Sequence, residues 1–381
     1  MRIAFFTEVY WPMVSGVSLT VQRAVAGLQD RGHAVRVYTA TYGVPSGQAD
    51  RPEVHRSRSR PFFVSPEVQW AFPNQRRLRV DLARFKPDLV HLATEFSLGL
   101  AGLRTARELE VPIIASSHTD YERYADRYRL RWAVAPGWRY LRWFYGHAAR
   151  VLCPSLPYEA HLHRRGVRHT AIWSRGVDSE RFHPRHRSEE WRRSLGIGPG
   201  DLLVTYVGRI APEKGIDVLL DAWELLGGLT ERLRLVFVGG GLAESEIARR
   251  RLPGVAVAGF RRDAELSAAY ASADLFVLPS ATETFGNVLL EAMASGLPCI
   301  AAAAGGPLDL VEHGWNGWLV RPDDPVALAA ALETLLADAD QRARLAHAAR
   351  KAAESRSWDA VHDGLLAEYD RASRGCRSRA A

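Results

Sequence analysis

The feature that most restricts the fold of this chain is a repeated alternation of short apolar runs with helical segments. Near the N-terminus RIAFFT and AVRVYTA flank a helical segment, and after residue 200 the pattern restarts with DLLVTYVGR and LRLVFVGGG. Such alternation predicts parallel sheets with right-handed crossover connections, and therefore the α/β class. Because 381 residues are too many for one core, we expect two domains.

The domain boundary is expected in the charged stretch RHRSEEWRRSLGIGPG, which separates the two series of strands. We predict a first Rossmann-like domain over residues 1–185, a linker over 186–200 and a second Rossmann-like domain over 201–355. An amphipathic helix is predicted over 356–375, followed by a disordered tail, 376–381. Within the first domain, segment 43–79 is expected to be loop-like, and two helices are expected to flank Pro136-Gly137.

Composition excludes several classes of protein. The hydrophobic fraction of 47% and the charged fraction of 24% are typical of a soluble globular chain. No run of about 18 apolar residues predicts a membrane span, and MRIAFFTEVYW shows no cleavable signal pattern. The three cysteines lie far apart in the sequence, which predicts reduced thiols and neither a zinc site nor a disulfide scaffold. We therefore expect a cytoplasmic protein.

The positive charge is concentrated in the first half of the chain. Residues 1–190 hold 29 Lys and Arg against 18 Asp and Glu, although the net charge of the whole chain is only +7. A basic half indicates an anionic partner, either acidic lipid or nucleic acid, unless the composition is simply rich in arginine.

Basic and aromatic residues alternate between 121 and 150, which contains seven arginines and three tryptophans. This mixture favours a surface that enters the headgroup layer of a membrane. Contact with single-stranded nucleic acid and a merely solvated pair of helices are the alternatives. No nucleic-acid reader motif accompanies the stretch, so we expect no nucleic-acid partner. The candidate residues for membrane or acceptor binding are Arg127, Arg131, Trp132, Trp138, Arg142 and Trp143.

A second group of candidates surrounds the segment TETFGNVLLEAMASGLPCIAAAAGG, residues 282–306. Glu283 and Glu291 lie eight residues apart around the start of a predicted helix. A helix N-terminus offers backbone N–H groups and a partial positive charge to an anion, and the carboxylates accept hydrogen bonds from hydroxyls. Such a site suits a ligand that is both a polyol and a phosphate, and a nucleotide sugar is the working hypothesis.

Two cations strengthen that hypothesis. Arg209 and Lys214 lie five residues apart in the loop that leaves the first strand of the second domain. The chain has only three lysines, so a lysine in this loop is notable. Both cations can reach a diphosphate above the strand ends. Two solvated loop cations are the alternative interpretation.

The first domain contributes two weaker candidates. The first strand-to-helix turn lacks GxGxxG, which argues against an NAD or FAD enzyme, but Gly16 would let a backbone approach a phosphate closely. His118 follows a predicted strand, at the edge where parallel sheets bind ligands. An ordinary loop glycine and a core histidine are the structural alternatives.

Together these motifs resemble those of the retaining family-4 glycosyltransferases. The segments that carry the resemblance are VGRIAPEKG, the VGGG strand end, ETFGNVLLEAMASGLP and the final Gly-Gly turn. The resemblance covers nearly the whole chain and implies a GT-B fold, in which two Rossmann-like domains face a deep cleft and a C-terminal helix crosses back to the N-terminal domain. FTEVYWPMVSGVS, SHTDY and WSRGVDSERFHP are most similar to a lipid-modifying branch, which includes sulfoquinovosyl-diacylglycerol synthases and GDP-mannose-dependent glycolipid α-mannosyltransferases.

The resemblance implies a role for each candidate. Glu291 would bind the donor ribose, and Glu283 would hold the transferred sugar. Arg209 and Lys214 would bind the diphosphate, Gly16 would approach the distal phosphate, and His118 would lie near the reacting face. Many relatives have Gly-Gly where this chain has Ser15-Gly16. The expected catalytic residues are Arg209, Lys214, Glu283 and His118. The expected donor-binding residues are Gly16, Arg209, Lys214, Gly239, Gly241, Phe260, Arg261, Glu283, Phe285, Gly286, Asn287 and Glu291.

The chemistry implied by the resemblance is transfer of a hexosyl unit with retention, from GDP-mannose or a UDP-hexose to a lipid such as a diacylglycerol-based lipid. No cofactor is expected, and no metal, because the only Asp-x-Asp, Asp338-Ala339-Asp340, lies far in sequence from the phosphate loops. The enzyme would bind the inner face of an anionic membrane peripherally. A soluble sugar or sugar-phosphate acceptor remains an alternative, as do a sugar-nucleotide epimerase and a non-catalytic nucleotide-binding module.

Overall fold

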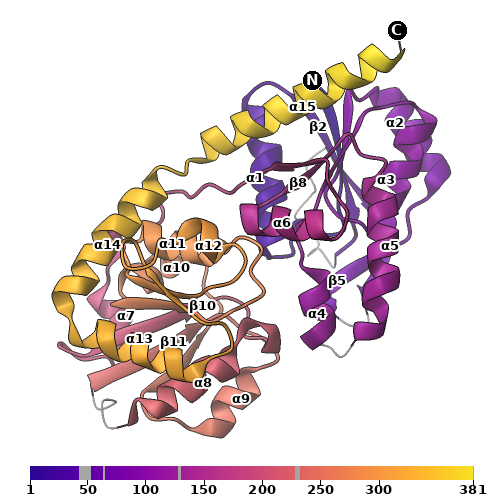
Figure 1. Ribbon diagram of the computed structural model, residues 1–381. Coiled ribbons are helices and arrows are strands. Elements are labelled where there is room, and N and C mark those ends of the chain that lie inside the picture. Colours follow the sequence, from indigo (N-terminus) through magenta and orange to yellow (C-terminus); the bar gives the residue numbers. More distant parts are fainter. Residues whose placement is uncertain (43–52, 63–64, 128–129, 228–231, 381) are drawn as a thin grey trace. The chain divides into compact units, whose positions relative to one another are not determined.

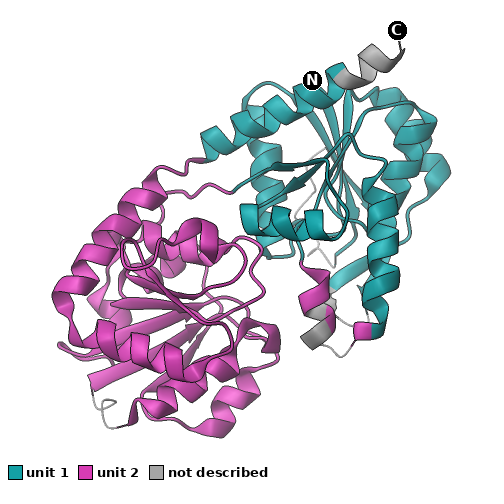
Figure 2. Ribbon diagram, in the orientation of Figure 1, with its two compact units in different colours: residues 1–119, 132–174, 358–381 teal, residues 120–131, 175–357 magenta. Residues whose placement is uncertain are grey.

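The computed structural model describes residues 1–42, 53–62, 65–127, 130–227 and 232–380 (Figure 1). The chain divides into two compact units, shown in Figure 2. Unit 1 comprises Met1–Thr119, Trp132–Ser174 and Trp358–Ala381, and unit 2 comprises Asp120–Arg131 and Arg175–Ser357. The division after residue 174 comes earlier than the predicted boundary at 185.

Unit 1 is built around a parallel sheet of seven strands in the order β3-β2-β1-β6-β7-β8-β9. The strand order reverses between β1 and β6, and open α/β sheets bind ligands beyond the carboxyl ends of the strands at such a reversal. A separate antiparallel pair, β4 and β5, is also present. The strands are β1 (Arg2–Phe6), β2 (Ala34–Ala40), β3 (Val54–Ser57), β4 (Ser59–Phe62), β5 (Ser65–Ala71), β6 (Leu89–Leu92), β7 (Ile113–Ser116), β8 (Arg150–Cys153) and β9 (Thr170–Ile172).

The helices of unit 1 begin at capping residues that the sequence supplies. Ser15, Asn74 and Ser155 each accept a backbone N–H from the first turn of the helix that follows. The α-helices are α1 (Gly16–Asp30), α2 (Gln75–Phe85), α3 (Ser97–Glu108), α5 (Val134–Tyr145), α6 (Leu156–Arg164) and α15 (Trp358–Ala380).

The C-terminal helix α15 belongs to unit 1, which confirms the predicted return of the chain to the N-terminal domain (Figures 1 and 2). It packs against α1, where Gly27 leaves the space that the ring of His362 fills. Leu365 and Tyr369 are fully buried in the core of unit 1. The Arg31 guanidinium lies 2.9 Å from the Asp359 carboxylate across the same contact.

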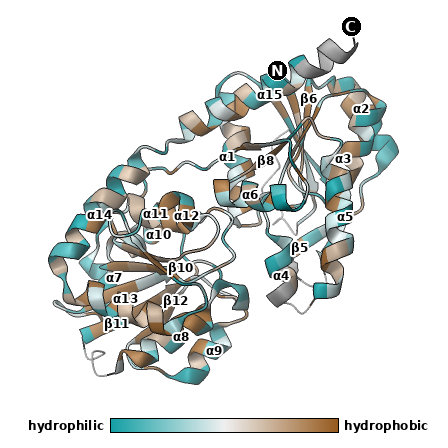
Figure 3. Cartoon of the chain, viewed as in Figure 1, coloured by the Kyte–Doolittle hydropathy of each residue, from teal (hydrophilic) through white to brown (hydrophobic). Residues whose placement is uncertain are grey.

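Unit 2 has a parallel sheet of six strands in the order β12-β11-β10-β13-β14-β15, with its reversal between β10 and β13. In Figure 1, α8, α9 and α13 cover one face of this sheet and α10, α11 and α12 cover the other. Figure 3 shows brown, hydrophobic strands such as β10 and β12 between helices of mixed colour, as a two-sided core requires. The strands are β10 (Leu202–Val207), β11 (Leu233–Val238), β12 (Val255–Gly259), β13 (Leu275–Leu278), β14 (Cys299–Ala302) and β15 (Trp318–Val320).

The connections of unit 2 are mostly short helices. The α-helices are α4 (Tyr121–Arg127), α7 (Glu189–Ser194), α8 (Ile216–Leu225), α9 (Glu244–Arg250), α10 (Asp263–Ala271), α11 (Asn287–Ala294), α12 (Pro307–Leu310), α13 (Pro325–Ala337) and α14 (Ala339–Glu354). The 3₁₀ turns are η1 (Arg131–Ala133, which spans the division between the units), η2 (Pro184–His186) and η3 (Pro212–Lys214).

Four local expectations differ from the structure. Segment 43–79 was expected to be loop-like, but its described part forms β3, β4, β5 and the start of α2. The helix α5 continues through Pro136-Gly137, because a proline in the first turn lacks only an N–H that has no helical acceptor. Residues 376–380 continue α15, where a disordered tail was expected.

The predicted linker 186–200 is the fourth difference. It contains α7, whose Arg192 has a side chain only 3% exposed. That guanidinium lies 3.0 Å from the Asp274 carboxylate and donates to the Ser272 carbonyl at 2.8 Å. A buried arginine with a carboxylate and a carbonyl as partners anchors the segment, and these residues are part of unit 2.

Candidate active site

The candidate site of unit 2 lies where its strand order reverses. The loop after β10 carries Arg209 and Lys214, and the loop after the adjacent strand β13 carries Glu283. All strands of the sheet are parallel, so both loops leave from the same edge. This edge is where open α/β sheets bind their ligands.

Lys214 and Glu283 form the central ion pair of the site. The Lys214 Nζ lies 2.6 Å from the Glu283 Oε1, and the two side chains are only 17% and 15% exposed. The contact joins residues 69 positions apart in the sequence. The carboxylate therefore holds the ammonium at this edge of the sheet.

Arg209 is held by an acid that the sequence analysis did not single out. Its guanidinium forms a hydrogen-bonded ion pair with Glu213, whose side chain is fully buried. The Thr282 hydroxyl donates to the Glu213 carbonyl at 3.1 Å, which ties the two loops together. A sequence signal was present, since Glu213 stands next to Lys214 in the loop.

Glu291 is fixed by a tyrosine that no sequence pattern indicated. The Tyr270 hydroxyl donates to the Glu291 Oε2 at 2.9 Å. Burial, and next the charge of Glu291, raise the pKa of Tyr270 well above its ordinary value. The phenol therefore stays protonated and orients the Glu291 carboxylate, which lies in the middle of α11.

The turn before α11 depends on a close approach between two loops. The Gly306 N–H donates to the Glu283 carbonyl at 2.9 Å. A Cβ on Gly306 would collide with the backbone of Phe285, so only glycine fits there. Phe285 is buried, and no side chain caps α11, which begins at Asn287 after Gly286. The sequence prediction of a helix N-terminus between the two carboxylates is confirmed.

The loops after β10 and β11 also touch each other. A Cβ on Gly239 would collide with the Gly208 carbonyl, and the Ile210 N–H donates to the Gly240 carbonyl at 2.9 Å. Gly241 approaches Ile210 in the same way. The glycines thus let these strand ends stack side by side.

The two candidates after β12 differ in exposure. Phe260 is 52% exposed, with the Arg262 guanidinium 5.0 Å from the centre of its ring. The Arg261 guanidinium instead lies over the Trp191 ring of α7, 5.5 Å from its centre. In this structure Arg261 is therefore engaged with α7 and Phe260 is the more accessible of the two.

The candidates of unit 1 lie at the carboxyl edge of the unit 1 sheet. Gly16 is exposed and is the first residue of α1. His118 follows β7 and is only 7% exposed, with its Nε2 2.8 Å from the Ser116 hydroxyl. The indole of Trp173 packs edge-on against the His118 ring at 5.5 Å.

The six candidates for membrane or acceptor binding divide into three groups. Arg131, Trp132, Arg142 and Trp143 are exposed, Trp132 by 76%. Trp138 is only 5% exposed and packs against His161, so its assignment to the surface was wrong. It belongs to the apolar stripe of α5 with Leu141, Phe144 and Tyr145. The side chain of Arg127 lies outside the described residues.

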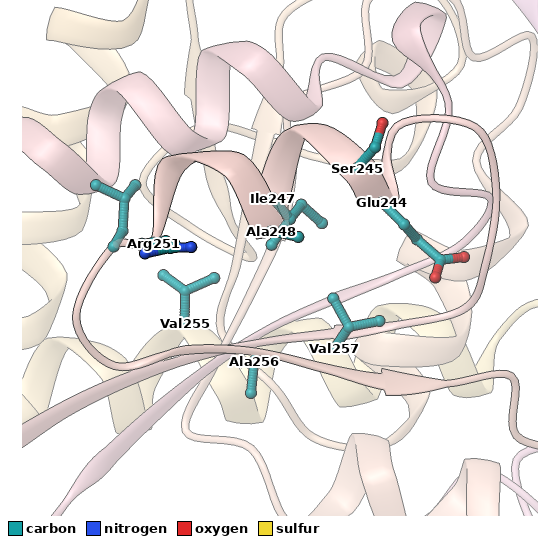
Figure 4. A pocket seen from close by; sticks show the side chains of 9 residues that line it. Glu244, Ser245, Ile247, Ala248, Arg251, Val255, Ala256 and Val257 are labelled. Atoms are coloured by element: carbon teal, nitrogen blue, oxygen red, sulfur yellow. The ribbon is translucent and has the colours of Figure 1, made fainter.

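A pocket of unit 2 lies between α9 and β12 (Figure 4). Its lining includes Ile247, Ala248, Val255 and Val257, with Glu244 at one end. None of the candidate donor-binding residues lines it, so the chemical candidates and this pocket are separate. In the described ranges, no three His, Cys, Asp or Glu side chains are grouped in a way that could hold a metal ion. No described helix is long and apolar enough to cross a bilayer.

Comparison with known proteins identifies the family. Residues 14–181 match the model "Glycosyltransferase Family 4", and residues 187–352 match "Glycosyl transferases group 1". The chain is 38% identical over 379 residues to a GDP-mannose-dependent alpha-mannosyltransferase of Mycolicibacterium smegmatis, covering 97% of each chain. The chain is a family-4 glycosyltransferase.

Several relatives of the chain belong to the lipid-modifying branch of this family. The sulfoquinovosyl transferase SQD2 of Arabidopsis thaliana is 36% identical over 370 residues, which is 94% of this chain and 71% of the relative. The glycosyltransferase is accordingly a hexosyltransferase that uses a nucleotide-sugar donor.

Solved structures place its fold in the GT-B class. The sucrose-phosphate synthase of Thermosynechococcus elongatus aligns with a TM-score of 0.79 at 22% identity, covering 97% of this chain and 98% of the other. Anabaena Alr3699/HepE, solved with UDP and glucose, aligns with a TM-score of 0.76, also at 22% identity, covering 97% and 99%. The predicted fold class is therefore confirmed.

Proposed function

We propose that this glycosyltransferase moves a hexosyl unit, with retention of the anomeric configuration, from GDP-mannose or a UDP-hexose to a lipid acceptor. The transfer would take place at the surface of an anionic membrane and would need no metal ion. The observation that carries the proposal is the Lys214–Glu283 ion pair at the reversal point of the unit 2 sheet. It combines a cation for a diphosphate with a carboxylate for sugar hydroxyls.

The donor would be held by groups whose geometry the structure describes. Lys214 and Arg209 would neutralise the diphosphate, and Glu283 would accept hydrogen bonds from the transferred sugar. Glu291, oriented by the Tyr270 hydroxyl at 2.9 Å, would accept those of the ribose. The backbone N–H groups around Phe285 and Gly286 would face the sugar.

The chemistry would depend on stabilising the leaving group. Glu283 is assigned to hydroxyls of the transferred sugar and Glu291 to those of the ribose, so neither is proposed as the nucleophile of a double displacement. Front-face attack through an oxocarbenium-like state is then the favoured path, and the leaving diphosphate would accept the acceptor's proton. Most of the rate would come from electrostatic stabilisation of the charge that develops on the diphosphate.

Donor identity is tested by a thermal-shift screen of GDP, UDP and their sugars, because a ligand that binds the folded state raises its stability by mass action. A donor that shifts the melting temperature is then incubated with a diacylglycerol-based lipid. The configuration of the product, read from the coupling of its anomeric proton, tests retention. An inverted product would exclude the front-face path, and no stabilisation by any nucleotide would refute donor binding in this site.

The membrane part of the proposal is supported by the outer face of α5. Pro136, Arg139, Arg142 and Trp143 recur at a spacing of three or four residues and are all exposed. Such spacing puts them on one face of the helix. Arginines beside an interfacial tryptophan suit anionic headgroups, to which each cation near the surface adds about 1 kcal/mol.

Flotation with vesicles of neutral or anionic lipid tests that face. We expect the wild-type chain to float with anionic vesicles and the double variant Arg139→Glu/Trp143→Ala to stay at the bottom of the gradient. Trp315→Ala, which removes a tryptophan that is 51% exposed in unit 2, is the matched control and should float. Failure of the wild-type chain to bind anionic vesicles would favour a soluble sugar or sugar-phosphate acceptor.

A further inference from the structure

Four buried polar side chains of unit 1 form a continuous hydrogen-bonded chain that ends at His118. The Tyr369 hydroxyl on α15 lies 2.6 Å from the His91 Nδ1 on β6. The His91 Nε2 lies 3.0 Å from the Ser116 Oγ on β7, and that oxygen lies 2.8 Å from the His118 Nε2. Ser116 and His118 are two residues apart along an extended segment, which puts both side chains on one face.

Aromatic rings surround this series of hydrogen-bonded side chains. The His91 ring lies 4.7 Å from the ring of Phe5 and 5.4 Å from that of Trp173, which also contacts His118. Tyr369, His91 and Ser116 are fully buried. Because an unpaired polar group in such surroundings is costly, each hydrogen in the chain must point at the next acceptor.

The direction of the hydrogen bonds follows from Tyr369. Among the described residues, His91 is the one hydrogen-bond partner of its hydroxyl. Burial raises the pKa of Tyr369 well above its ordinary value, so the phenol keeps its proton and donates it to the His91 Nδ1. The His91 proton is then on Nε2 and is donated to the Ser116 oxygen. The Ser116 hydroxyl in turn donates to the His118 Nε2.

We propose that Tyr369, through His91 and Ser116, fixes His118 as a neutral imidazole with its proton on Nδ1. The His118 Nε2 lone pair is occupied by the Ser116 O–H, so it cannot serve as a general base through that atom. His118 would act as a hydrogen-bond donor through Nδ1, and Tyr369, His91 and Ser116 are positioning residues. Only the use of that donor toward the sugar rests on the proposed function; the tautomer itself does not.

The C-terminal helix thereby acquires a chemical role besides packing. Tyr369 is 278 residues from His91 in the sequence, and its hydroxyl is the only part of the side chain that the hydrogen-bonded chain uses. Tyr369→Phe keeps the ring and removes that hydroxyl. The substitution therefore removes the hydroxyl that donates to the His91 Nδ1 and selects the direction of the remaining hydrogen bonds.

Nitrogen NMR of the ¹⁵N-histidine-labelled full-length chain tests this proposal, because protonated and bare ring nitrogens resonate at well-separated shifts. His118→Gln assigns the His118 signals. In the wild type we expect a protonated Nδ1 and a bare Nε2 on His118. In Tyr369→Phe the Nε2 signal should move toward the protonated position, as the two tautomers mix.

A matched control separates this effect from the general loss of a buried hydroxyl. Tyr38 is also fully buried in unit 1, and its hydroxyl donates to Asp81 at 2.7 Å, outside the chain described above. Tyr38→Phe should leave the His118 signals in place. If Tyr369→Phe prevents α15 from docking, Ser116→Ala is the alternative test. It removes the hydroxyl that donates to the His118 Nε2, and we expect the same shift of the Nε2 signal.

Three results would overturn the proposal. These are a protonated His118 Nε2 in the wild type, a doubly protonated His118 at neutral pH, and an unchanged His118 tautomer in both Tyr369→Phe and Ser116→Ala. Because the NMR measurement needs no substrate, the proposed tautomer of His118 would stand even if the proposed transferase function were wrong. An inactive enzyme with the expected shifts would instead refute only the transfer reaction.

Discussion

Replacing Lys214 by alanine tests the central assignment of the donor site. Both side chains of the Lys214–Glu283 pair are less than one-fifth exposed, which suggests an effective dielectric constant of about 20. A full charge pair at about 4 Å then contributes about 4 kcal/mol, and a half-developed charge on the leaving diphosphate about 2 kcal/mol. Loss of one preorganised donor to a developing oxyanion costs about 2.7–4 kcal/mol. We therefore expect Lys214→Ala to lower kcat by about 30-fold to 1,000-fold.

The same substitution should leave the fold intact. Removing one partner of a partly buried pair costs about 1–3 kcal/mol, less than the stability of a typical domain. Nucleoside diphosphate release measures kcat, and thermal melting monitors folding. Lys351→Ala, which removes an exposed lysine of α14, is the control and should match the wild type in both. A change confined to KM, with kcat within about threefold of the wild type, would refute the role in leaving-group stabilisation because it would indicate uniform binding.

Four further outcomes are expected. Arg192→Met leaves the Asp274 carboxylate without its buried cation and should destabilise unit 2 by about 3 kcal/mol in urea unfolding; a loss below about 1 kcal/mol would contradict the anchoring of α7. Gly306→Ala should raise the donor KM more than about tenfold by displacing the Glu283 loop. Gly364→Ala is the control, because open space surrounds the added Cβ: it should leave the donor KM unchanged and raise the free energy of unfolding by about 0.5–1 kcal/mol. An equal donor KM in the two variants would count against the close approach at Gly306. Burial and then the Arg31 charge lower the pKa of His362 below 6.5, so the unfolded state binds more protons. The free energy of unfolding should therefore fall as the pH drops through about 6.5, and His362→Gln should flatten that dependence; identical pH profiles would refute this. Turnover should survive excess EDTA, and its abolition would refute metal independence.

The local patterns of the sequence were sufficient for the architecture. Short apolar runs that alternate with helical segments are local properties, so the alternation of strands and helices could be predicted for both units. The motif spacing also gave the right edge of the sheet for Lys214 and Glu283, because parallel strands place their carboxyl ends together. Segment 43–79 was mispredicted since Pro, Ser and Arg hide the weak signal of short strands.

The same kind of signal was available, and missed, for Trp138. Leu141, Phe144 and Tyr145 follow it at helical spacing, so the buried stripe of α5 was present in the sequence. The exposed stripe of the same helix retains Arg142 and Trp143. A count of arginines and aromatics over a segment ignores the helical period, and the period decides which side chains reach the surface.

By itself, the sequence determined the fold class, the family and the loops in which chemistry is expected, because these follow from short-range patterns of residue type. Only the tertiary structure decided the partners of the functional side chains: Glu213 for Arg209, Tyr270 for Glu291, and the Tyr369 chain for His118. Tyr270 and Tyr369 lie on other elements than the residues they contact, and no local pattern encodes the packing that brings them within hydrogen-bonding distance. Glu213 lies only four residues from Arg209, but its full burial is likewise a result of tertiary packing.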